Sequence, residues 1–318
     1  MTREMTVGLA QRSPIQTTDA GGWDVDAFAD DVRATLAEHP GIDVLVYPEL
    51  HLCGVDRLSE SERTAALWTA AKRIAAETEE IQGLGRLARE HGIWLVPGSV
   101  CERGEDARGE LLFNTQLVFA PTGELTATYR KIFPWRPFEP YTPGTEFVVT
   151  EIVTESPAGA DSPAVTAKAV AGLSICYDAW FPEVTRHLAW MGAEIVLNVV
   201  QTTTPDRAQE LVLARANAIV NQTFTVSVNC AAPLGEGQSI VVDPEGTVLA
   251  EAGREPAILV VTVDLDHVDR VRAHGTAGTN RMWSQFRDGD LPIPLPLYGG
   301  RIDPETWHPR VPGPPNPA

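Results

Sequence analysis

The chain has 318 residues, of which 43% are hydrophobic and 21% are charged, and its formal net charge at pH 7 is −18. This length and composition are typical of a globular protein with a large core, and the negative charge disfavours nucleic acids and anionic membranes as partners. No segment approaches the roughly 18 apolar residues of a membrane span, and residues 1–11 lack the layout of a signal peptide. We therefore expect a cytoplasmic protein.

Strand and helix patterns alternate through the first hundred residues. The predicted strands are the apolar runs at residues 5–10, 42–47 and 93–100. Between them, apolar residues at three- and four-residue spacing predict a helix over residues 23–39 and a long helical region over residues 59–91. Ser59 and Glu62 form the pattern of a capping box at the start of the long region, and Gly92 provides its end.

The rest of the chain continues this alternation. Further strands are predicted at residues 112–119, 124–129, 147–153, 169–175, 194–200, 224–230, 239–242, 247–250 and 258–263. Helices are predicted at residues 181–191, at 265–272, and from a cap at Thr204 or Asp206 to about Asn221, with Leu211, Ala214, Ala218 and Ile219 facing inward. Turn signals at residues 120–123 and 243–246 indicate two hairpins. The pattern is that of an α/β protein with mixed sheets.

Composition gives no reason to divide the chain into two domains. We expect one domain over residues 1–280 and an irregular, proline-rich extension over residues 281–318, which wraps a surface or a neighbouring subunit.

The four cysteines contain no CxxC pair and indicate free thiols rather than a disulfide framework. His51 and Cys53 have a metal-like spacing, but two ligands do not complete a zinc site, so we expect no metal and assign both residues to packing near Glu49. Cys101 and Cys230 are predicted to lie in the core.

Cys176 lies where a predicted strand meets a predicted helix. The strand over residues 169–175 ends at this cysteine, and Pro182 and Glu183 have the character of a first helical turn. Free backbone N–H groups at such a corner favour a thiolate and can hold an oxyanion, so we expect a lowered pKa for the Cys176 thiol. The alternative is a buried cysteine without chemistry, because a lone cysteine needs partners from elsewhere in the fold.

Two further reactive residues stand at strand ends, and their surroundings carry a family resemblance. Glu49 lies in YPEL, Lys131 in YRKIFPW and Cys176 in CYDAWFPE. In order and context these residues resemble the Glu–Lys–Cys triad of the nitrilase, or carbon–nitrogen hydrolase, superfamily. The resemblance extends from the first strand to about residue 263. It implies a four-layer α-β-β-α sandwich and association through the helical face into a homodimer or larger homo-oligomer.

The resemblance also implies a thiol amidohydrolase that cleaves a carboxamide to an acid and ammonia through a Cys176 thioester, without a cofactor. Glu49 would be the general base, and Lys131 would stabilise the oxyanion together with the Tyr177 backbone N–H. Thiolate attack divides the hydrolysis into thioester formation and thioester hydrolysis, which suits an amide because its carbonyl is a poor electrophile.

The loop over residues 131–144, KIFPWRPFEPYTPG, is similar to the corresponding loop of aliphatic amidases and formamidases. Such amidases have a second glutamate shortly after the lysine, which implies that Glu139 is a fourth catalytic residue that orients Lys131 or the substrate amide. Tyr177, Trp135, Phe138 and Trp180 are the predicted substrate contacts.

Several other functions remain open at this point. True nitrilases usually have Cys-Trp-Glu where this chain has Cys-Tyr-Asp, so a carboxamide comes first, an N-carbamoyl compound second and a nitrile third. An N-carbamoyl amino acid needs a cation for its carboxylate, which Arg136, Arg207 or Arg281 could supply. A catalytically inactive binding subunit and a thiol-redox protein are the alternatives of another class.

Overall fold

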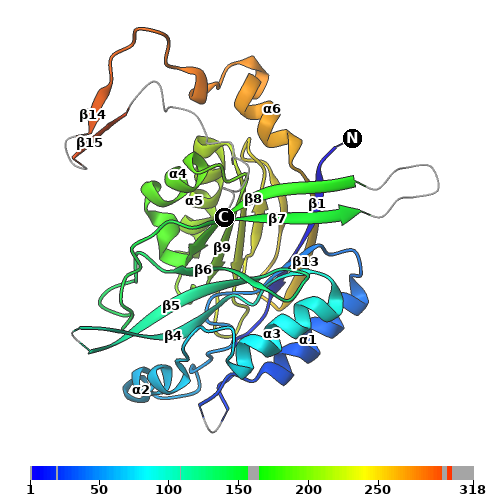
Figure 1. Cartoon of the computed structure of the whole chain (residues 1–318), viewed down its shortest axis with the longest axis vertical. Coiled ribbons are helices and arrows are strands. Elements are labelled where there is room, and N and C mark those ends of the chain that lie inside the picture. The colour runs from blue at the N-terminus through cyan, green and yellow to red at the C-terminus, as the bar shows by residue number, and fades with distance from the viewer. Residues whose placement is uncertain (1, 19–20, 108, 157–164, 296–298, 303–318) are drawn as a thin grey trace.

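The computed structural model describes residues 2–18, 21–107, 109–156, 165–295 and 299–302, and two β-sheets form its centre (Figure 1). The strands of the first sheet are β1 (Glu4–Gln11), β2 (Val44–Val46), β3 (Trp94–Val96), β4 (Ser99–Asp106), β5 (Gly109–Phe119), β6 (Leu125–Arg130) and β13 (Ala257–Asp264). Their order is β13–β1–β2–β3–β5–β4, with β6 paired to β5. β1, β2 and β3 are parallel to one another, and the remaining pairs are antiparallel.

The second sheet has the order β12–β11–β10–β9–β8–β7 within the described residues. Its strands are β7 (Val149–Ser156), β8 (Val165–Ile175), β9 (Ile195–Val200), β10 (Phe224–Asn229), β11 (Ile240–Val242) and β12 (Val248–Glu251). The three central strands β8, β9 and β10 are parallel, so their carboxyl ends meet at one edge. This edge is where an open α/β sheet usually binds its ligand.

Helices cover the outer face of each sheet. The helices are α1 (Val25–Glu38), α2 (Glu60–Ala70), α3 (Glu79–His91), α4 (Pro182–Trp190), α5 (Arg207–Asn221) and α6 (Asp266–His274). α1 and α3 pack against the first sheet, and α4 and α5 pack against the second (Figure 1). The result is the four-layer α-β-β-α sandwich that the resemblance implied. None of the helices within the described residues combines the length and apolar character that crossing a membrane requires.

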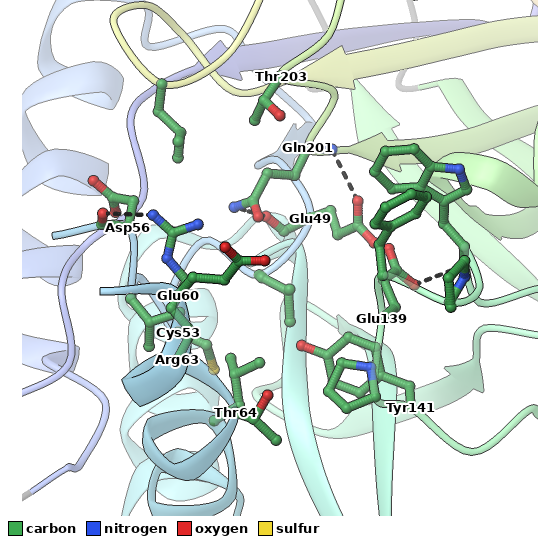
Figure 2. Close-up of a pocket in the computed structure, with 18 residues that line it drawn as sticks. Glu49, Cys53, Asp56, Glu60, Arg63, Thr64, Glu139, Tyr141, Gln201 and Thr203 are labelled. Carbon is green, nitrogen blue, oxygen red and sulfur yellow. Dashed lines mark hydrogen bonds between the residues drawn. The ribbon is translucent and has the colours of Figure 1, made fainter. Parts of the chain in front are cut away.

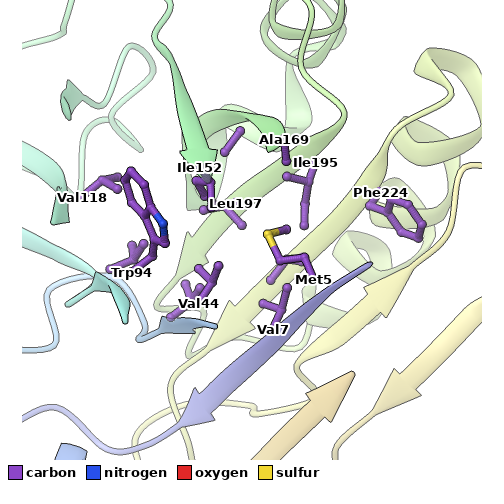
Figure 3. Packing of buried hydrophobic residues seen from close by; sticks show 14 of the residues in the cluster. Met5, Val7, Val44, Trp94, Val118, Ile152, Ala169, Ile195, Leu197 and Phe224 are labelled. Atoms are coloured by element: carbon purple, nitrogen blue, oxygen red, sulfur yellow. The ribbon is translucent and has the colours of Figure 1, made fainter. Parts of the chain in front are cut away.

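Alternation along the strands explains the layers. On β2, Val44 and Val46 face the core between the two sheets, whereas Leu45 faces the helices outside. On β9, Ile195 and Leu197 face the same central core, and Val196 faces the opposite helical layer. Figure 3 shows Val44, Ile195 and Leu197 in this central core. Because side chains alternate along a strand, an apolar residue at every position is what a sheet buried on both faces requires.

The two hairpins and the predicted strands other than that over residues 93–100 are confirmed, but the single helical region over residues 59–91 is wrong. The structure has two helices there, α2 and α3, separated by residues 71–78. The Lys72 N–H donates to the Cys101 carbonyl at 3.2 Å, and the Arg103 N–H donates to the Lys72 carbonyl at 2.8 Å. Lys72 thus forms a bridge to β4, and these two bonds satisfy its backbone N–H and C=O where the helix has ended. The Ser59–Glu62 capping box and the left-handed Gly92 are as predicted.

Three smaller predictions also need correction. The predicted strand over residues 93–100 is two strands, β3 and β4, because Gly98 turns the chain between them. Ile219 does not face inward, since its side chain is 43% exposed. The extension after residue 280 is not wholly irregular: β14 (Ile293–Leu295) and β15 (Gly300–Ile302) form a small antiparallel pair apart from the sheets (Figure 1). Residues 303–318 lie outside the described residues, so the predicted wrapping of the tail stays a prediction.

Gly98 offers a test of how the chain is held beside Glu49. Its φ is +84°, and a Cβ there would lie 1.7 Å from the Pro48 carbonyl oxygen, immediately before Glu49. Gly92 also has positive φ, +65°, but a Cβ there would meet nothing within 4 Å. We expect Gly92→Ala to cost about 1 kcal/mol of unfolding free energy, and Gly98→Ala to cost clearly more because it adds a backbone clash to the same strain. Urea unfolding of both variants measures this, and equal costs would contradict it.

Candidate active site

Glu49 follows β2 and lies between the two sheets. Its backbone N–H donates to the Val200 carbonyl at the end of β9, at 3.3 Å. The side chain is only 2% exposed, and its carboxylate accepts from Asn114 Nδ2 at 2.7 Å and from the Gln201 N–H at 2.9 Å (Figure 2). Elements from both sheets therefore fix the position of this carboxylate. Neither Asn114 nor Gln201 could be selected from the sequence, because they reach Glu49 only when β5 and the end of β9 fold beside it.

Lys131 directly follows the strand β6 and is fully buried. Its Nζ lies 2.9 Å from Glu49 Oε1 and 2.8 and 3.0 Å from the two carboxylate oxygens of Glu139. Two negative groups thus surround one ammonium. Burial lowers the pKa of Lys131, but the charges of Glu49, Cys176 and Glu139 outweigh it and raise that pKa well above its usual value. The lysine is therefore a fixed positive charge, and it is unsuited to act as a base at neutral pH.

Glu139 belongs to the loop after Lys131. Its carboxylate also accepts from the Trp135 N–H at 3.1 Å, and its own N–H donates to the Trp135 carbonyl at 2.9 Å. Burial raises the pKa of Glu139, the Lys131 charge lowers it, and the neighbouring Glu49 raises it again. These contacts place Glu139 directly on Lys131, as expected for a residue that orients the ammonium.

Cys176 lies at the end of β8, where the chain turns into a short 3₁₀ helix, Cys176–Trp180. Its φ is +46°, a left-handed conformation that is strained for a residue with a side chain and is found preferentially at functional sites. The buried Asp178 carboxylate holds the turn, because it accepts from the Ile175 N–H at 3.0 Å, the Phe133 N–H at 2.9 Å and the Tyr129 hydroxyl at 2.7 Å. These bonds tie the cysteine turn to the segment that carries Lys131.

The expected lowering of the Cys176 pKa is wrong. Burial and the Glu49 charge raise the pKa of the Cys176 thiol well above its usual value, and Glu210 and Glu139 raise it further. Lys131 acts in the opposite direction without reversing the effect. The prediction considered only the backbone N–H groups of the corner, whereas the fold surrounds the thiol with carboxylates that belong to distant segments.

A cavity of about 570 Å³ opens onto this cluster. Glu49, Glu139 and Gln201 form one side of it, and Asp56, Glu60 and Arg63, at the start of α2, form another (Figure 2). The aromatic rings of Trp135, Phe138 and Tyr141 complete the wall. An apolar wall with a few converging polar groups is the usual form of a small-molecule site.

The four predicted substrate contacts do not all reach this cavity. Trp135 and Phe138 line it, and their ring centroids are 4.4 Å apart. Tyr177 and Trp180 are not among its 18 lining residues. They pack beside each other instead, with ring centroids 5.9 Å apart. Cys176 is also absent from this lining, so the cavity lies on the Glu49 and Glu139 side of the cluster.

Arg63 is the arginine that lines the cavity, and none of the three arginines proposed from the sequence does so. Arg207 is buried in an ion pair with Glu210, 3.0 Å apart, and Arg136 and Arg281 are exposed elsewhere. Arg63 donates to two backbone carbonyls, of Leu58 at 3.1 Å and Asp56 at 3.1 Å. Arg63 could not be selected from the sequence, because it lines the cavity only when the fold places the start of α2 beside Glu139.

His51 and Cys53 are buried near Glu49, and each packs against residues of the core. The His51 ring lies against Phe28 and Tyr47, with centroids 5.8 and 4.8 Å away, and burial lowers the pKa of His51 to about 4. Cys53 Sγ accepts from the Cys101 N–H at 3.2 Å. Elsewhere, ligand atoms of Asp243, Glu245 and His267 lie within 4.8 Å of one another. These three residues are remote in the sequence from the acidic cluster around Lys131.

A family comparison agrees with this geometry. The carbon–nitrogen hydrolase family matches residues 6–273. The chain belongs to the carbon–nitrogen hydrolase family. It is 34% identical over 241 residues to a 2-oxoglutaramate amidase of Paenarthrobacter nicotinovorans, covering 73% of this chain and 75% of that protein. It is 29% identical over 277 residues to a formamidase of Pseudomonas syringae pv. tomato, covering 85% and 75%.

Solved structures of carbon–nitrogen hydrolases share the fold. Nit3 of Saccharomyces cerevisiae, from branch 10 of the nitrilase superfamily, superimposes with a TM-score of 0.70 at 24% identity, over 89% of this chain and 97% of that one. An amidase of Nesterenkonia sp. AN1, solved in complex with butyramide, has a TM-score of 0.61 at 25% identity, over 86% and 95%. The prediction of an amidase-type enzyme of the nitrilase superfamily, acting on non-peptide C–N bonds, is confirmed.

The pKa of Cys176 can be measured through its reactivity. Because the thiolate is the reacting form, we expect iodoacetamide to label Cys176 slowly at pH 6–7 and faster with each rise in pH through and beyond pH 9. Mass spectrometry of the peptide containing residue 176 gives the rate at each pH, and Lys131→Met should shift the profile to still higher pH. Rapid labelling at pH 6 that is independent of pH would contradict the raised pKa.

Proposed function

We propose that this carbon–nitrogen hydrolase cleaves a small carboxamide to the acid and ammonia through a thioester on Cys176. The observation that best supports this is the Lys131 ammonium, fully buried and bonded to both Glu49 and Glu139 beside the cysteine turn. A buried lysine surrounded by carboxylates is costly for stability alone, since a well-packed apolar residue could replace it. Such a cluster is understandable where a fixed positive charge has a chemical task.

Acylation begins with the thiol. As the Cys176 sulfur attacks the amide carbon, Glu49 takes the thiol proton and the C–S bond forms. Negative charge develops on the amide oxygen, where the Lys131 ammonium and the Tyr177 backbone N–H stabilise it. Glu49 then returns the proton to the amide nitrogen, the C–N bond breaks, and ammonia leaves.

Deacylation repeats these steps with water. Glu49 accepts a proton from water as the oxygen attacks the thioester carbon, and the same oxyanion contacts operate again. The C–S bond breaks, the sulfur recovers the proton from Glu49, and the acid is released. Glu139 takes no proton in this scheme. It holds Lys131 against Glu49, and its contacts of 2.8 and 3.0 Å to the ammonium fit that task.

The relatives support both the substrate class and the covalent step. Two of them are a 2-oxoglutaramate amidase and a formamidase, so primary amides rank ahead of N-carbamoyl compounds and nitriles. A variant of the Nesterenkonia amidase, 26% identical, carries the acetamide moiety of fluoroacetamide covalently on its active-site cysteine. By this likeness Cys176 forms a bond to the carbon skeleton of its substrate.

We also expect the chain to associate with copies of itself through its outer helices. On α5, Val212 is 67% exposed, and Ile219 and Val220 are 43% and 46% exposed. Three exposed aliphatic residues on one helix favour a covered surface.

Ammonia release tests the proposed roles. With a panel of small primary amides, we expect Cys176→Ala to abolish ammonia release and Glu49→Gln and Lys131→Met to lower kcat by at least about 100-fold each. Cys230→Ala, at a buried cysteine that takes no part in the proposed scheme, serves as the control and should retain activity. If wild type and Cys176→Ala release equal ammonia, or if neither releases any from any amide, carbamoyl compound or nitrile, the proposal fails and an inactive binding subunit gains support.

A substitution of Arg63 tests whether this residue binds the end of the substrate that lies away from the amide. A guanidinium on the wall opposite Glu139 suits an amide that carries a carboxylate, such as the substrate named for the 2-oxoglutaramate amidase. We expect Arg63→Met to raise KM about tenfold for ω-amides with a carboxylate and to leave neutral aliphatic amides unchanged. Arg57→Met, an exposed neighbour outside the lining, is the control. Equal effects on charged and neutral amides would contradict a carboxylate contact.

A further inference from the structure

Besides Glu49, a second series of polar side chains, linked by hydrogen bonds, reaches Cys176. Cys176 Sγ lies 3.8 Å from the Thr202 hydroxyl, within hydrogen-bonding distance for sulfur. That hydroxyl lies 2.8 Å from each carboxylate oxygen of Glu210, and Glu210 pairs with Arg207 at 3.0 Å. The contacts thus run without a gap from the sulfur into the helix α5.

This series of side chains is buried and rigid. Thr202 is 6% exposed, and its N–H donates to Asn229 Oδ1 at 2.8 Å. Arg207 is also buried, and besides Glu210 it donates to the Gln238 carbonyl at 2.8 Å and to the Ser227 hydroxyl at 3.2 Å. Burial and these hydrogen bonds hold Thr202 and Arg207 in place.

The direction of the hydrogen bonds follows from the chemistry of the groups. An ionised carboxylate only accepts, so the single hydroxyl hydrogen of Thr202 points to Glu210. Thr202 then presents a lone pair to Cys176, which can accept a hydrogen from S–H but gives nothing to a thiolate. The charged groups that act on the thiol are Glu49, Glu139 and Glu210 on the negative side and Lys131 on the positive side.

We propose that Thr202 and Glu210 are positioning residues that hold Cys176 as a neutral thiol until a bound amide allows Glu49 to take its proton. The inference rests on the proposed function, in which Cys176 is the nucleophile. The nucleophile is latent without substrate, so the electrophiles and oxidants that react with thiolates find it unreactive. Glu210 acts only through Thr202 and through its charge, and it contacts no reacting atom.

Glu210→Gln is the main test, because it removes the charge and keeps the shape. We expect the pH profile of Cys176 alkylation by iodoacetamide to shift to lower pH, so that alkylation at pH 7 is about 3- to 10-fold faster, as a shift of half to one pKa unit gives. Glu194→Gln is the matched control: Glu194, like Glu210, is 8% exposed and paired with an arginine, Arg3, at 2.9 Å, but it is not among the charges that mainly shift the pKa of the thiol. The control should leave the profile unchanged.

Thr202 supplies a second test that does not depend on how Glu210→Gln folds. We expect Thr202→Val to lower kcat for ammonia release about tenfold with little change in KM, because the sulfur loses its fixed position, and Thr202→Ser to retain the wild-type kcat. Circular dichroism confirms folding of each variant.

The outcomes separate this inference from the proposed function. A profile for Glu210→Gln that matches wild type, an equal shift in Glu194→Gln, or a Thr202→Val variant with wild-type kcat would overturn the positioning role and leave the triad untouched. Ammonia release by Cys176→Ala would instead overturn the proposed function, whatever the alkylation profiles show.

Discussion

One buried ion cluster governs the arrangement of the site. Lys131 has no exposed surface, and its ammonium is bonded to the carboxylates of Glu49 and Glu139. Removing either carboxylate would leave charge that burial penalises, so the three residues are stable only together. Glu49 comes from the end of β2, Lys131 from the end of β6 and Glu139 from the following loop. The cluster therefore connects the three chain segments, and the sheets set the distances between them.

The apolar residues that follow one another along the strands explain why the layered architecture could be predicted. Apolar runs such as that around Leu45 indicated strands buried on both faces, and the hairpin turn at residues 120–123 indicated an antiparallel pair. Local sequence patterns do not show which of two possible backbone partners a segment takes, a helix of its own or a strand from elsewhere in the chain. Nothing within residues 59–91 reveals that Lys72 pairs with the edge of β4, and this pairing lies directly after the end of α2.

The residues of the site likewise divide into those that the sequence could identify and those that it could not. Glu49, Lys131, Glu139 and Cys176 could be selected from the sequence because their surroundings resemble a family pattern. Asn114, Thr202 and Arg63 could not, since each is an ordinary residue type whose role depends on which segment folds against it. The direction of the Cys176 pKa was mistaken for the same reason: the backbone of the corner is local, but the carboxylates around the sulfur are not.

A raised thiol pKa fits amide hydrolysis better than a permanent thiolate would. A thiolate stabilised by its surroundings is a weaker nucleophile, because intrinsic nucleophilicity falls as pKa falls. In the proposed mechanism a neutral thiol beside a carboxylate avoids this loss, since its proton moves to Glu49 only as the C–S bond forms. The proton taken by Glu49 is then already in place for the departing nitrogen, which cannot leave as an amide anion. Glu49, whose charge raises the pKa of Cys176, is therefore also the group that carries the proton which the C–N bond needs in order to break.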